Sequence, residues 1–358
     1  RDRAVLDLLL AALHHDSRRL IEARPETTTA AQWSALFELA AEQRVRTLVH
    51  HRLHETGTAR VVPERTWQAF DTLCRAIARR KIAMHIELAA IIAAFGDAGI
   101  PVLVLKGGFL GPAVYDNVAL REMLDLDVLV PREQLGAADA RLRERGYRPN
   151  DADIPAVATD AHNHAPALRK AGAANVELHW NLTLPNLPTS IDPTHLWASA
   201  VPAPRIAPTA RTLSPVEMLL HLCLHASYQH RFEIGLRPFC DVDRLIRASP
   251  TLDWESVNAT RQQRGWQRGV ALTLAVAARL LDTPVPERLT RDVSAREIAI
   301  ASQLSFENPP PQQGAIRTLA PLGAHASWTE RVTAIGRRWF IGKQELIGLH
   351  GPVPRGVR

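Results

Sequence analysis

The chain has only three cysteines in 358 residues. Cys74, Cys223 and Cys240 lie far apart, and no two of them have Cys-x-x-Cys spacing. Disulfide-stabilised domains and cysteine-rich zinc sites both depend on closely or regularly spaced cysteines. The sequence therefore indicates neither, and a reducing, cytoplasmic setting is the simplest expectation.

Long apolar runs are also missing. The longest, at 100–105 and 270–281, are shorter than the roughly 20 residues that a helix needs to cross a bilayer. The first residues show no signal-peptide pattern. We therefore expect no membrane partner.

Lysine and aromatic residues are scarce, with four lysines and 5% aromatics, yet the net charge is +6 because arginine is abundant. The arginines are spread along the chain and are not interleaved with aromatic residues, unlike in typical nucleic-acid-binding surfaces. The distribution of arginines therefore argues against nucleic acid as a partner. Nucleotide phosphates would suit this charge balance.

Helix-forming sequence dominates both ends of the chain, and a stretch with strand character separates them. We predict a helical region at 1–95, an α/β core at 96–200 and a helical substrate-binding domain at 201–358. Seven prolines between positions 185 and 215 indicate a linker at the second boundary, and Ser214 is expected to cap the helix that follows. The predicted helices are 5–13, 32–41, 44–53, 64–78, 81–95, 133–145, 215–228, 239–248, 254–264 and 269–281, and the predicted strands are 101–105, 124–130, 164–169 and 175–181.

A pair of aspartates lies within the second predicted strand. Asp125 and Asp127 are two residues apart, so both side chains project from the same face of a strand. Two carboxylates held this close repel each other and need a compensating cation. Oxygen ligands of this kind suit Mg²⁺ or Mn²⁺, which completes its coordination with substrate phosphate and water. An exposed polar strand face is the alternative.

A lysine and two glycines follow the first predicted strand. Lys106 could hold a phosphate as a point charge, or it could simply flank a turn. Gly107 and Gly108 allow backbone amides to approach an anion, and a helix after them would add its positive N-terminal end. The position one loop upstream of the aspartate pair favours a phosphate-binding role.

These motifs together resemble the DNA polymerase β-type nucleotidyltransferase superfamily, and more closely the uncharacterised nucleotidyltransferase family. The resemblance extends over roughly residues 30–250. It rests on Leu105-Lys106-Gly107, Tyr115, Arg121, Asp125-Leu126-Asp127, Glu177-Leu178-His179-Trp180 and the segment from Glu217 through His225 to Arg237 and Asp241. The loop from Gly108 to Asp125 is longer than in the simplest members of the superfamily.

The resemblance implies an α+β fold, with a mixed sheet in a polymerase β-like core flanked by the two helical regions. It also implies a third carboxylate on a neighbouring strand, for which Glu177 is the best candidate. Asp125, Asp127 and Glu177 are then both catalytic residues and metal ligands. The residues expected to bind substrate or nucleotide are Lys106, Gly107, Gly108, Arg121, His179, His225, Arg237 and Asp241.

Two assignments stay open on the sequence alone. Arg121 could bind phosphate or pair with Asp125. His221 and His225 lie four residues apart with Cys223 between them, which permits a zinc reading, but a third ligand is missing. We therefore expect histidines that face core or substrate and no zinc site.

The sequence thus predicts a metal-dependent enzyme that transfers a group from a nucleoside triphosphate, or a related activated nucleotide, to a hydroxyl or phosphate acceptor. The acceptor would be a small molecule or a peptide. Glycosyl transfer from a nucleotide sugar in the tailoring of a peptide natural product is an alternative. A binding module that holds a nucleotide without turnover is another.

Overall fold

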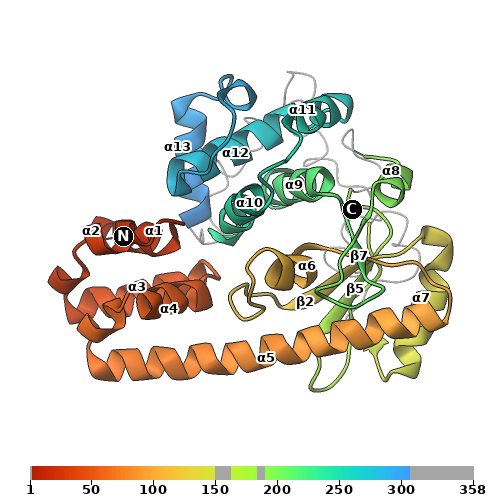
Figure 1. The fold of residues 1–358 in the computed structure, drawn as a ribbon, viewed down its shortest axis with the longest axis horizontal. Helices are drawn as coiled ribbons and strands as arrows, with labels where there is room; N and C mark the ends of the chain where they lie inside the picture. The colour runs from red at the N-terminus through yellow and green to blue at the C-terminus, as the bar shows by residue number, and fades with distance from the viewer. Residues whose placement is uncertain (1, 150–162, 184–189, 307–358) are drawn as a thin grey trace, which may run out of the picture.

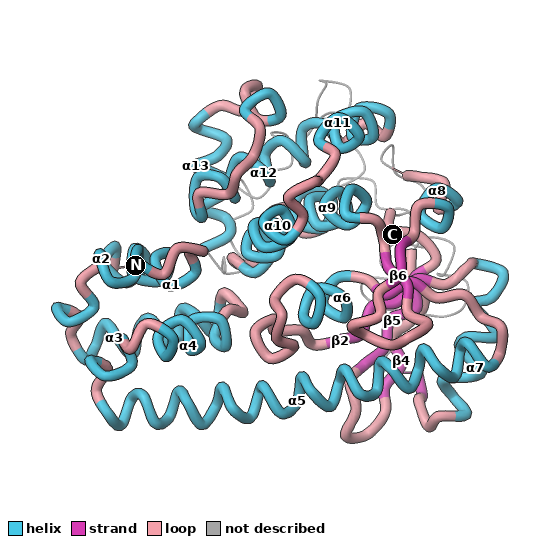
Figure 2. Tube along the Cα trace, in the orientation of Figure 1, coloured by secondary structure: helices cyan, strands magenta, loops and turns pink. Residues whose placement is uncertain are grey.

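The computed structural model describes residues 2–149, 163–183 and 190–306 (Figure 1). A group of short helices forms the N-terminal region, and a long helix connects it to the sheet (Figures 1 and 2). These elements are α1 (Arg3–Leu13), α2 (Arg18–Glu22), η1 (Pro25–Thr27), α3 (Ala30–Glu42), α4 (Arg46–Glu55), η2 (Thr58–Val61) and α5 (Glu64–Asp97).

Helix α5 corrects one prediction. The sequence suggests separate helices at 64–78 and 81–95, but the structure has one helix of 34 residues. Arg79 and Arg80, which lie at the expected break, are good helix formers, so nothing interrupts the backbone hydrogen bonds. At 1.5 Å per residue the helix is roughly 50 Å long. It therefore reaches from the N-terminal helices to the far side of the sheet (Figure 1).

The sheet contains both parallel and antiparallel strands, as predicted. Its order is β3-β4-β5-β2-β1-β7-β6. The central pair, β2 and β5, is parallel, whereas β1 pairs antiparallel to β2 and parallel to β7. The strands are β1 (Leu103–Val104), β2 (Asp125–Leu129), β3 (Arg148–Pro149), β4 (Leu168–Arg169), β5 (Asn175–His179), β6 (Val201–Pro202) and β7 (Arg211–Thr212).

The two faces of the central strands differ in chemistry. Leu126 and Val128 of β2 belong to a hydrophobic cluster that also contains Ile91 of α5 and Leu142 of α7 (Leu135–Glu144). Side chains alternate along a strand, so Asp125 and Asp127 lie on the opposite face. Helix α6 (Lys106–Ala113) follows β1 and contacts β2, and the short helix η3 (Arg132–Gln134) precedes α7. One face is thus core, and the other is available for a polar site.

The proline-rich segment is not only a linker. It contains helix α8 (Thr194–Ala198) and strands β6 and β7, and β7 pairs with β1. Two-residue strands are too short to produce an alternating pattern that a sequence can reveal. Pro202 is tolerated because β6 is an edge strand, where no ladder hydrogen bond is lost. The sheet therefore continues to Thr212, although the three-region division itself stays a prediction.

The C-terminal helices pack around one another and against the N-terminal region. They are α9 (Pro215–Leu224), a π-helical turn η5 (His225–Gln229), α10 (Arg237–Ala248), α11 (Trp254–Gln263), α12 (Gln267–Leu281), η6 (Glu287–Leu289) and α13 (Ala295–Phe306). Ser214 caps α9 as predicted, since its side chain accepts a hydrogen bond from the Glu217 amide. In the described part of the chain, no helix is long and apolar enough to cross a membrane.

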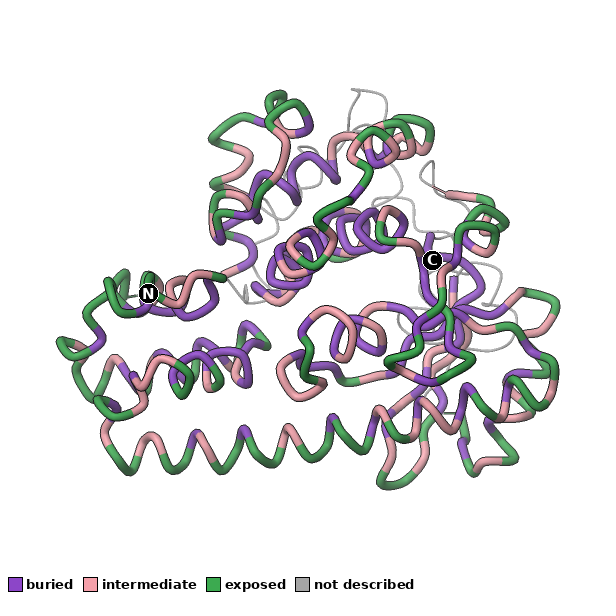
Figure 3. The backbone as a smooth tube through the Cα atoms, viewed as in Figure 1, coloured by how far each residue is buried: buried purple, intermediate pink, exposed green. Residues whose placement is uncertain are grey.

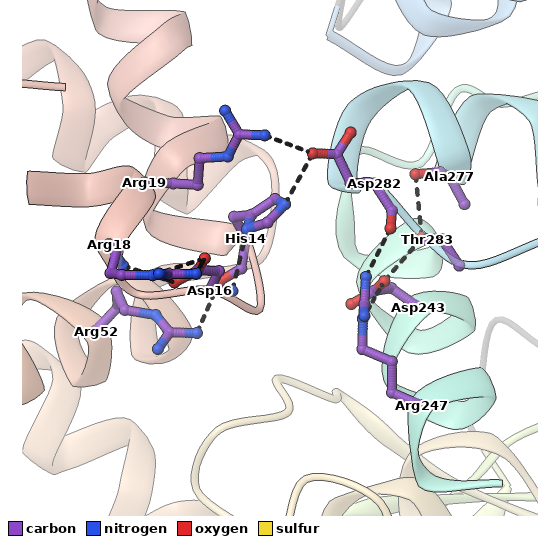
Figure 4. Close-up of polar contacts among 10 residues, drawn as sticks. All are labelled: His14, Asp16, Arg18, Arg19, Arg52, Asp243, Arg247, Ala277, Asp282 and Thr283. Atoms are coloured by element: carbon purple, nitrogen blue, oxygen red, sulfur yellow. Dashed lines mark hydrogen bonds and ion pairs between the residues drawn. The ribbon is translucent and has the colours of Figure 1, made fainter. Parts of the chain in front are cut away.

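One hydrophobic core includes residues from Val5 of α1 to Leu304 of α13, so the two helical regions share their interior (Figure 3). Polar contacts join them at the surface. Figure 4 shows Asp282 accepting hydrogen bonds from both His14 and Arg19, at 3.2 and 2.9 Å. The N-terminal helices are therefore held against the C-terminal end of α12, with the sheet beside them.

Candidate active site

The predicted acidic residues converge on the open face of the central strands. Because β2 and β5 run parallel in register, Asp127 lies directly beside Glu177, and Asp125 lies beside Asn175. His179, two residues after Glu177, projects from the same face. Asp127 and His179 are buried, with 7% and 4% of their surfaces exposed. The structure thus brings together Asp127, Glu177 and His179, and Asp125 projects from the same face of β2 without joining their close group.

Asp127 is the centre of this group. Its Oδ1 accepts hydrogen bonds from Lys106 Nζ at 2.9 Å and from His179 Nε2 at 2.8 Å. His179 Nε2 also lies 3.5 Å from Glu177 Oε2. Ligand atoms of Asp127, Glu177 and His179 all lie within 4.8 Å of one another, which allows the three to hold one metal ion. Among the described residues, this is the one group found with such geometry.

The carboxylates differ in how easily they are ionised. Burial opposes the charged form of Asp127, but the Lys106 ammonium and the His179 hydrogen bond hold its pKa well below the usual value. Burial raises the pKa of Asp125, and the negative charges of Asp127 and Glu177 raise it further. The positive charges near Asp125 therefore do not fully offset the negative charges around it.

The pKa values of Glu177 and His179 are shifted by the contact between these two residues and Asp127. A hydrogen bond from His179 lowers the pKa of Glu177 despite burial and the charge of Asp127. Burial lowers the pKa of His179, but its hydrogen bonds to Asp127 and Glu177 outweigh this and raise the value. One lysine and one histidine contact the carboxylates, and the charge of Arg237 also acts on Asp125, yet the pKa of Asp125 stays raised, so the negative charge is balanced incompletely. A divalent cation fits this donor set, because it would supply the missing positive charge.

Lys106 begins helix α6, next to the carboxylates. Gly107 and Gly108 are in the first turn of α6, and in the described structure no side chain caps this helix end. A Cβ on Gly107 would lie 2.0 Å from Arg121 Nη1, and one on Gly108 would lie 2.8 Å from Val104 Cγ1. The glycines are therefore required by close packing, and the uncapped amides beside Lys106 point to an anion-binding position.

Arg121 pairs with Asp241 and not with Asp125. Arg121 donates from Nη2 to Asp241 Oδ2 at 2.8 Å and from Nε to Oδ1 at 3.2 Å. The Tyr115 hydroxyl donates to the same Oδ1 at 2.8 Å. Arg121 and Asp241 are 6% and 1% exposed, so their charges face each other and not solvent. Their expected contact with substrate stays a prediction, and the geometry favours a supporting role.

Arg237 lies beside this pair. Its Nη1 donates to the Glu122 carbonyl at 2.9 Å, whereas its buried Nε has no hydrogen-bond partner in the described structure. Burial lowers the pKa of Arg237 to about 10, and the charge of Arg121 adds to this effect. The negative charges of Asp241 and Asp125 raise the pKa of Arg237 in turn, so the acidic site influences the ionisation of Arg237. An incompletely bonded guanidinium here suits a phosphate or another anion.

Three histidines face the acidic site from the C-terminal helices. Burial depresses the pKa values of His221, His225 and His230, and the charge of Lys106 lowers each further. His221 is 2% exposed, and neither of its ring nitrogens has a partner in the described structure. The Lys106 and Asp127 charges that act on these rings indicate that α9 and η5 lie over the acidic face. The sequence suggested His225 for this position, and the unpaired nitrogens of His221 are visible only in the structure.

Comparison with protein families identifies the family of the chain. The model of the uncharacterised nucleotidyltransferase family matches residues 29–282. The chain belongs to this family. The match includes every residue of the acidic site and both histidine-bearing elements. The predicted family and α+β fold class are therefore confirmed.

Other comparisons add less. The solution structure of the antibiotic-resistance factor ANT(2'')-Ia shares 15% sequence identity with this nucleotidyltransferase-family chain, with a TM-score of 0.37. The alignment covers 51% of this chain and 91% of that protein. A likeness this distant says nothing about the substrate here. No curated protein matches the sequence.

Proposed function

We propose that the chain is a metal-dependent nucleotidyltransferase that uses a nucleoside triphosphate as donor and a hydroxyl group of a small molecule or peptide as acceptor. The observation that carries this proposal is the cluster of three carboxylates on adjacent parallel strands, which one lysine and one histidine balance only in part. A site of this kind can bind a metal ion together with the phosphate groups of a nucleotide.

Each residue has a role on the donor side. Asp125, Asp127 and Glu177 would hold the divalent ion, Mg²⁺ or Mn²⁺. When bound, the ion neutralises charge that develops on the donor phosphates. Lys106 now donates to Asp127, and its flexible ammonium can turn to a phosphate oxygen once the ion takes over that carboxylate. The uncapped first turn of α6 adds backbone amides to the same anion.

The acceptor side combines Glu177 with the histidines over the site. Glu177 acts on the acceptor hydroxyl, either by accepting its proton or by holding a cation against its oxygen. The hydrogen bond from His179 keeps Glu177 ionised and ready for this role. His221 is buried, His225 is half-buried, and both are neutral, so they can exchange hydrogen bonds with a polar acceptor without adding charge. The acceptor oxygen would form a bond to the donor phosphorus as pyrophosphate leaves.

A ligand screen tests the donor class. The protein is incubated with Mg²⁺ or Mn²⁺ and each nucleoside triphosphate or nucleotide sugar, and its thermal unfolding is recorded. A donor present at 100 times its Kd should add about 2.7 kcal/mol to the free energy of unfolding. We expect a nucleoside triphosphate to give the largest metal-dependent stabilisation. A larger effect from a nucleotide sugar would point to glycosyl transfer, and no effect from any nucleotide would reject the proposal.

A further inference from the structure

The group formed by Asp127, Glu177 and His179 contains a nitrogen donor among oxygen donors. The imidazole is placed within the site and not at its edge, because Nε2 lies 2.8 Å from Asp127 Oδ1 and 3.5 Å from Glu177 Oε2. In an octahedral shell with metal–ligand bonds near 2.1 Å, neighbouring donor atoms lie roughly 3 Å apart. The observed separations are close to that spacing.

The position of His179 is also fixed by the fold. Asp127 and Glu177 are direct neighbours on parallel strands, and His179 shares the face of Glu177 two residues further along β5. His179 is 4% exposed, so its ring is confined among the carboxylates and is not free to turn into solvent. The strand pairing therefore presents all three side chains together without rearrangement of the backbone. Nε2 donates to Asp127 when no ion is bound, so binding an ion through Nε2 would release that proton.

The choice of donors affects which ion is preferred. Mg²⁺ favours oxygen ligands and retains several waters, whereas first-row transition ions also accept imidazole. A site of three carboxylates alone would suit Mg²⁺. Replacing one oxygen position with a neutral ring nitrogen lowers the negative charge of the donor set and adds a ligand that Mg²⁺ uses poorly.

We propose that His179 is itself a metal ligand and that the site consequently binds a first-row transition ion, represented by Mn²⁺, more tightly than Mg²⁺. This inference rests on the proposed metal-dependent function and specifies the ion and its nitrogen ligand. The alternative is that His179 only orients Asp127 by a hydrogen bond and never contacts the ion.

Titration of the protein with Mn²⁺ alone, followed by the electron paramagnetic resonance signal of free Mn²⁺, tests this without substrate or turnover. Mg²⁺ is then added as competitor. The wild type should bind Mn²⁺ more tightly than Mg²⁺. His179→Gln should lose about tenfold or more in Mn²⁺ affinity, while its Mg²⁺ affinity changes by less than roughly threefold. An unchanged ratio of the two affinities would mean that His179 is not a ligand.

His195→Gln is the matched control. His195 lies on the exposed surface of α8, so its replacement removes an imidazole without touching the acidic site. The control should keep the wild-type affinities for both ions. An equal loss of Mn²⁺ affinity in both variants would show binding to scattered surface histidines and would overturn the inference.

A measurement on the wild type keeps the test valid even if His179→Gln does not fold. Pulsed electron paramagnetic resonance of the Mn²⁺-bound protein detects nitrogen coordinated to the ion, and ¹⁵N-histidine labelling identifies the nitrogen as imidazole. Directly bound imidazole nitrogen supports the proposal. Tight Mn²⁺ binding with no nitrogen coupling refutes it and leaves the proposed function standing, whereas failure to bind either ion with or without nucleotide rejects the proposed function itself.

Discussion

The Asp241 and Asp127 carboxylates are both hidden from solvent, but the two are balanced in different ways. Asp241 faces a single guanidinium in a two-point ion pair and accepts one further hydrogen bond from Tyr115. Asp127 shares its lysine and histidine partners with two neighbouring carboxylates, Asp125 and Glu177. Asp241 is neutralised directly by Arg121, with Arg237 nearby as a further cation, whereas the second cluster is short of positive charge.

We interpret the balanced Arg121–Asp241 pair, called the closed pair below, as structural support. The group of Asp125, Asp127 and Glu177, called the open cluster, is the candidate functional site. A buried pair that satisfies its own charges gains nothing from a ligand, whereas a cluster with surplus negative charge gains from a bound cation. Arg121 of the closed pair also packs directly on Gly107, at the start of the helix that carries Lys106. The closed pair therefore positions the element that contacts the open cluster.

The largest expected effect comes from breaking the closed pair. Arg121→Met leaves Asp241 buried without its cation, which should cost about 3–5 kcal/mol in the free energy of unfolding. Urea denaturation measures this. Arg141→Met is the control, because Arg141 pairs with Glu144 on the exposed surface of α7 and should lose less than about 1 kcal/mol. Equal stability of the two variants, with weaker donor binding in Arg121→Met, would instead make Arg121 a substrate-binding residue.

A change in the open cluster should affect chemistry and leave stability nearly unchanged. Glu177→Gln removes the charge but keeps the shape of the side chain and an oxygen that can accept from His179, so the fold should survive. Donor turnover, followed as pyrophosphate release at saturating donor, should fall by about 10²-fold or more, equivalent to about 2.7 kcal/mol of barrier, while donor affinity changes little. Glu144→Gln on the surface is the control.

Two results would remove Glu177 from the chemistry. One is near-normal turnover, and the other is joint loss of turnover and donor binding through unfolding. Asp241 and Asp243 would then be the remaining candidates for the third acid. Both already have buried partners, since Asp241 pairs with Arg121 and Asp243 accepts from Arg247 and Thr283. The structure thus makes Glu177 the stronger candidate.

The smallest effect concerns a buried cation that has no ion pair among the described residues. Lys81 of α5 is 3% exposed and donates to the Met123 carbonyl, and burial lowers its pKa to about 8. Between this value and the unfolded value of 10.5, the unfolded chain binds more protons than the folded one. Stability should therefore rise as the pH increases through this window, relative to Lys81→Met, by about 2 kcal/mol. A constant difference from pH 7 to 10.5 would show that Lys81 is solvated normally.

The local part of the site could be predicted from the sequence. Asp125 and Asp127, and Glu177 and His179, lie two residues apart, and alternation along a strand is enough to put each pair on one face. That the two strands are neighbours was implied only by the family resemblance, and their parallel register is visible only in the structure. The capping of α9 by Ser214 was equally local, and it is confirmed.

The long-range contacts could not be predicted in this way. Arg121 and Asp241 are 120 positions apart, and no spacing rule links them. Strands β6 and β7 are two residues each and exist because β1 offers them a partner. The continuity of α5 is a different case, because Arg79 and Arg80 favour helix and the sequence is compatible with one uninterrupted helix.

The proposed function requires that the open acidic cluster hold the metal on which nucleotidyl transfer depends. The most direct test is the double variant Asp125→Asn/Asp127→Asn, measured for Mg²⁺- or Mn²⁺-dependent nucleotide binding and pyrophosphate release. Asp139→Asn/Glu144→Gln, which neutralises two carboxylates on α7, is the matched control. We expect the double variant to fold, with some loss of stability because Lys106 and His179 lose the charge that they contact. It should lose metal-dependent binding and turnover, while the control retains both. Wild-type turnover in a correctly folded double variant would contradict the account.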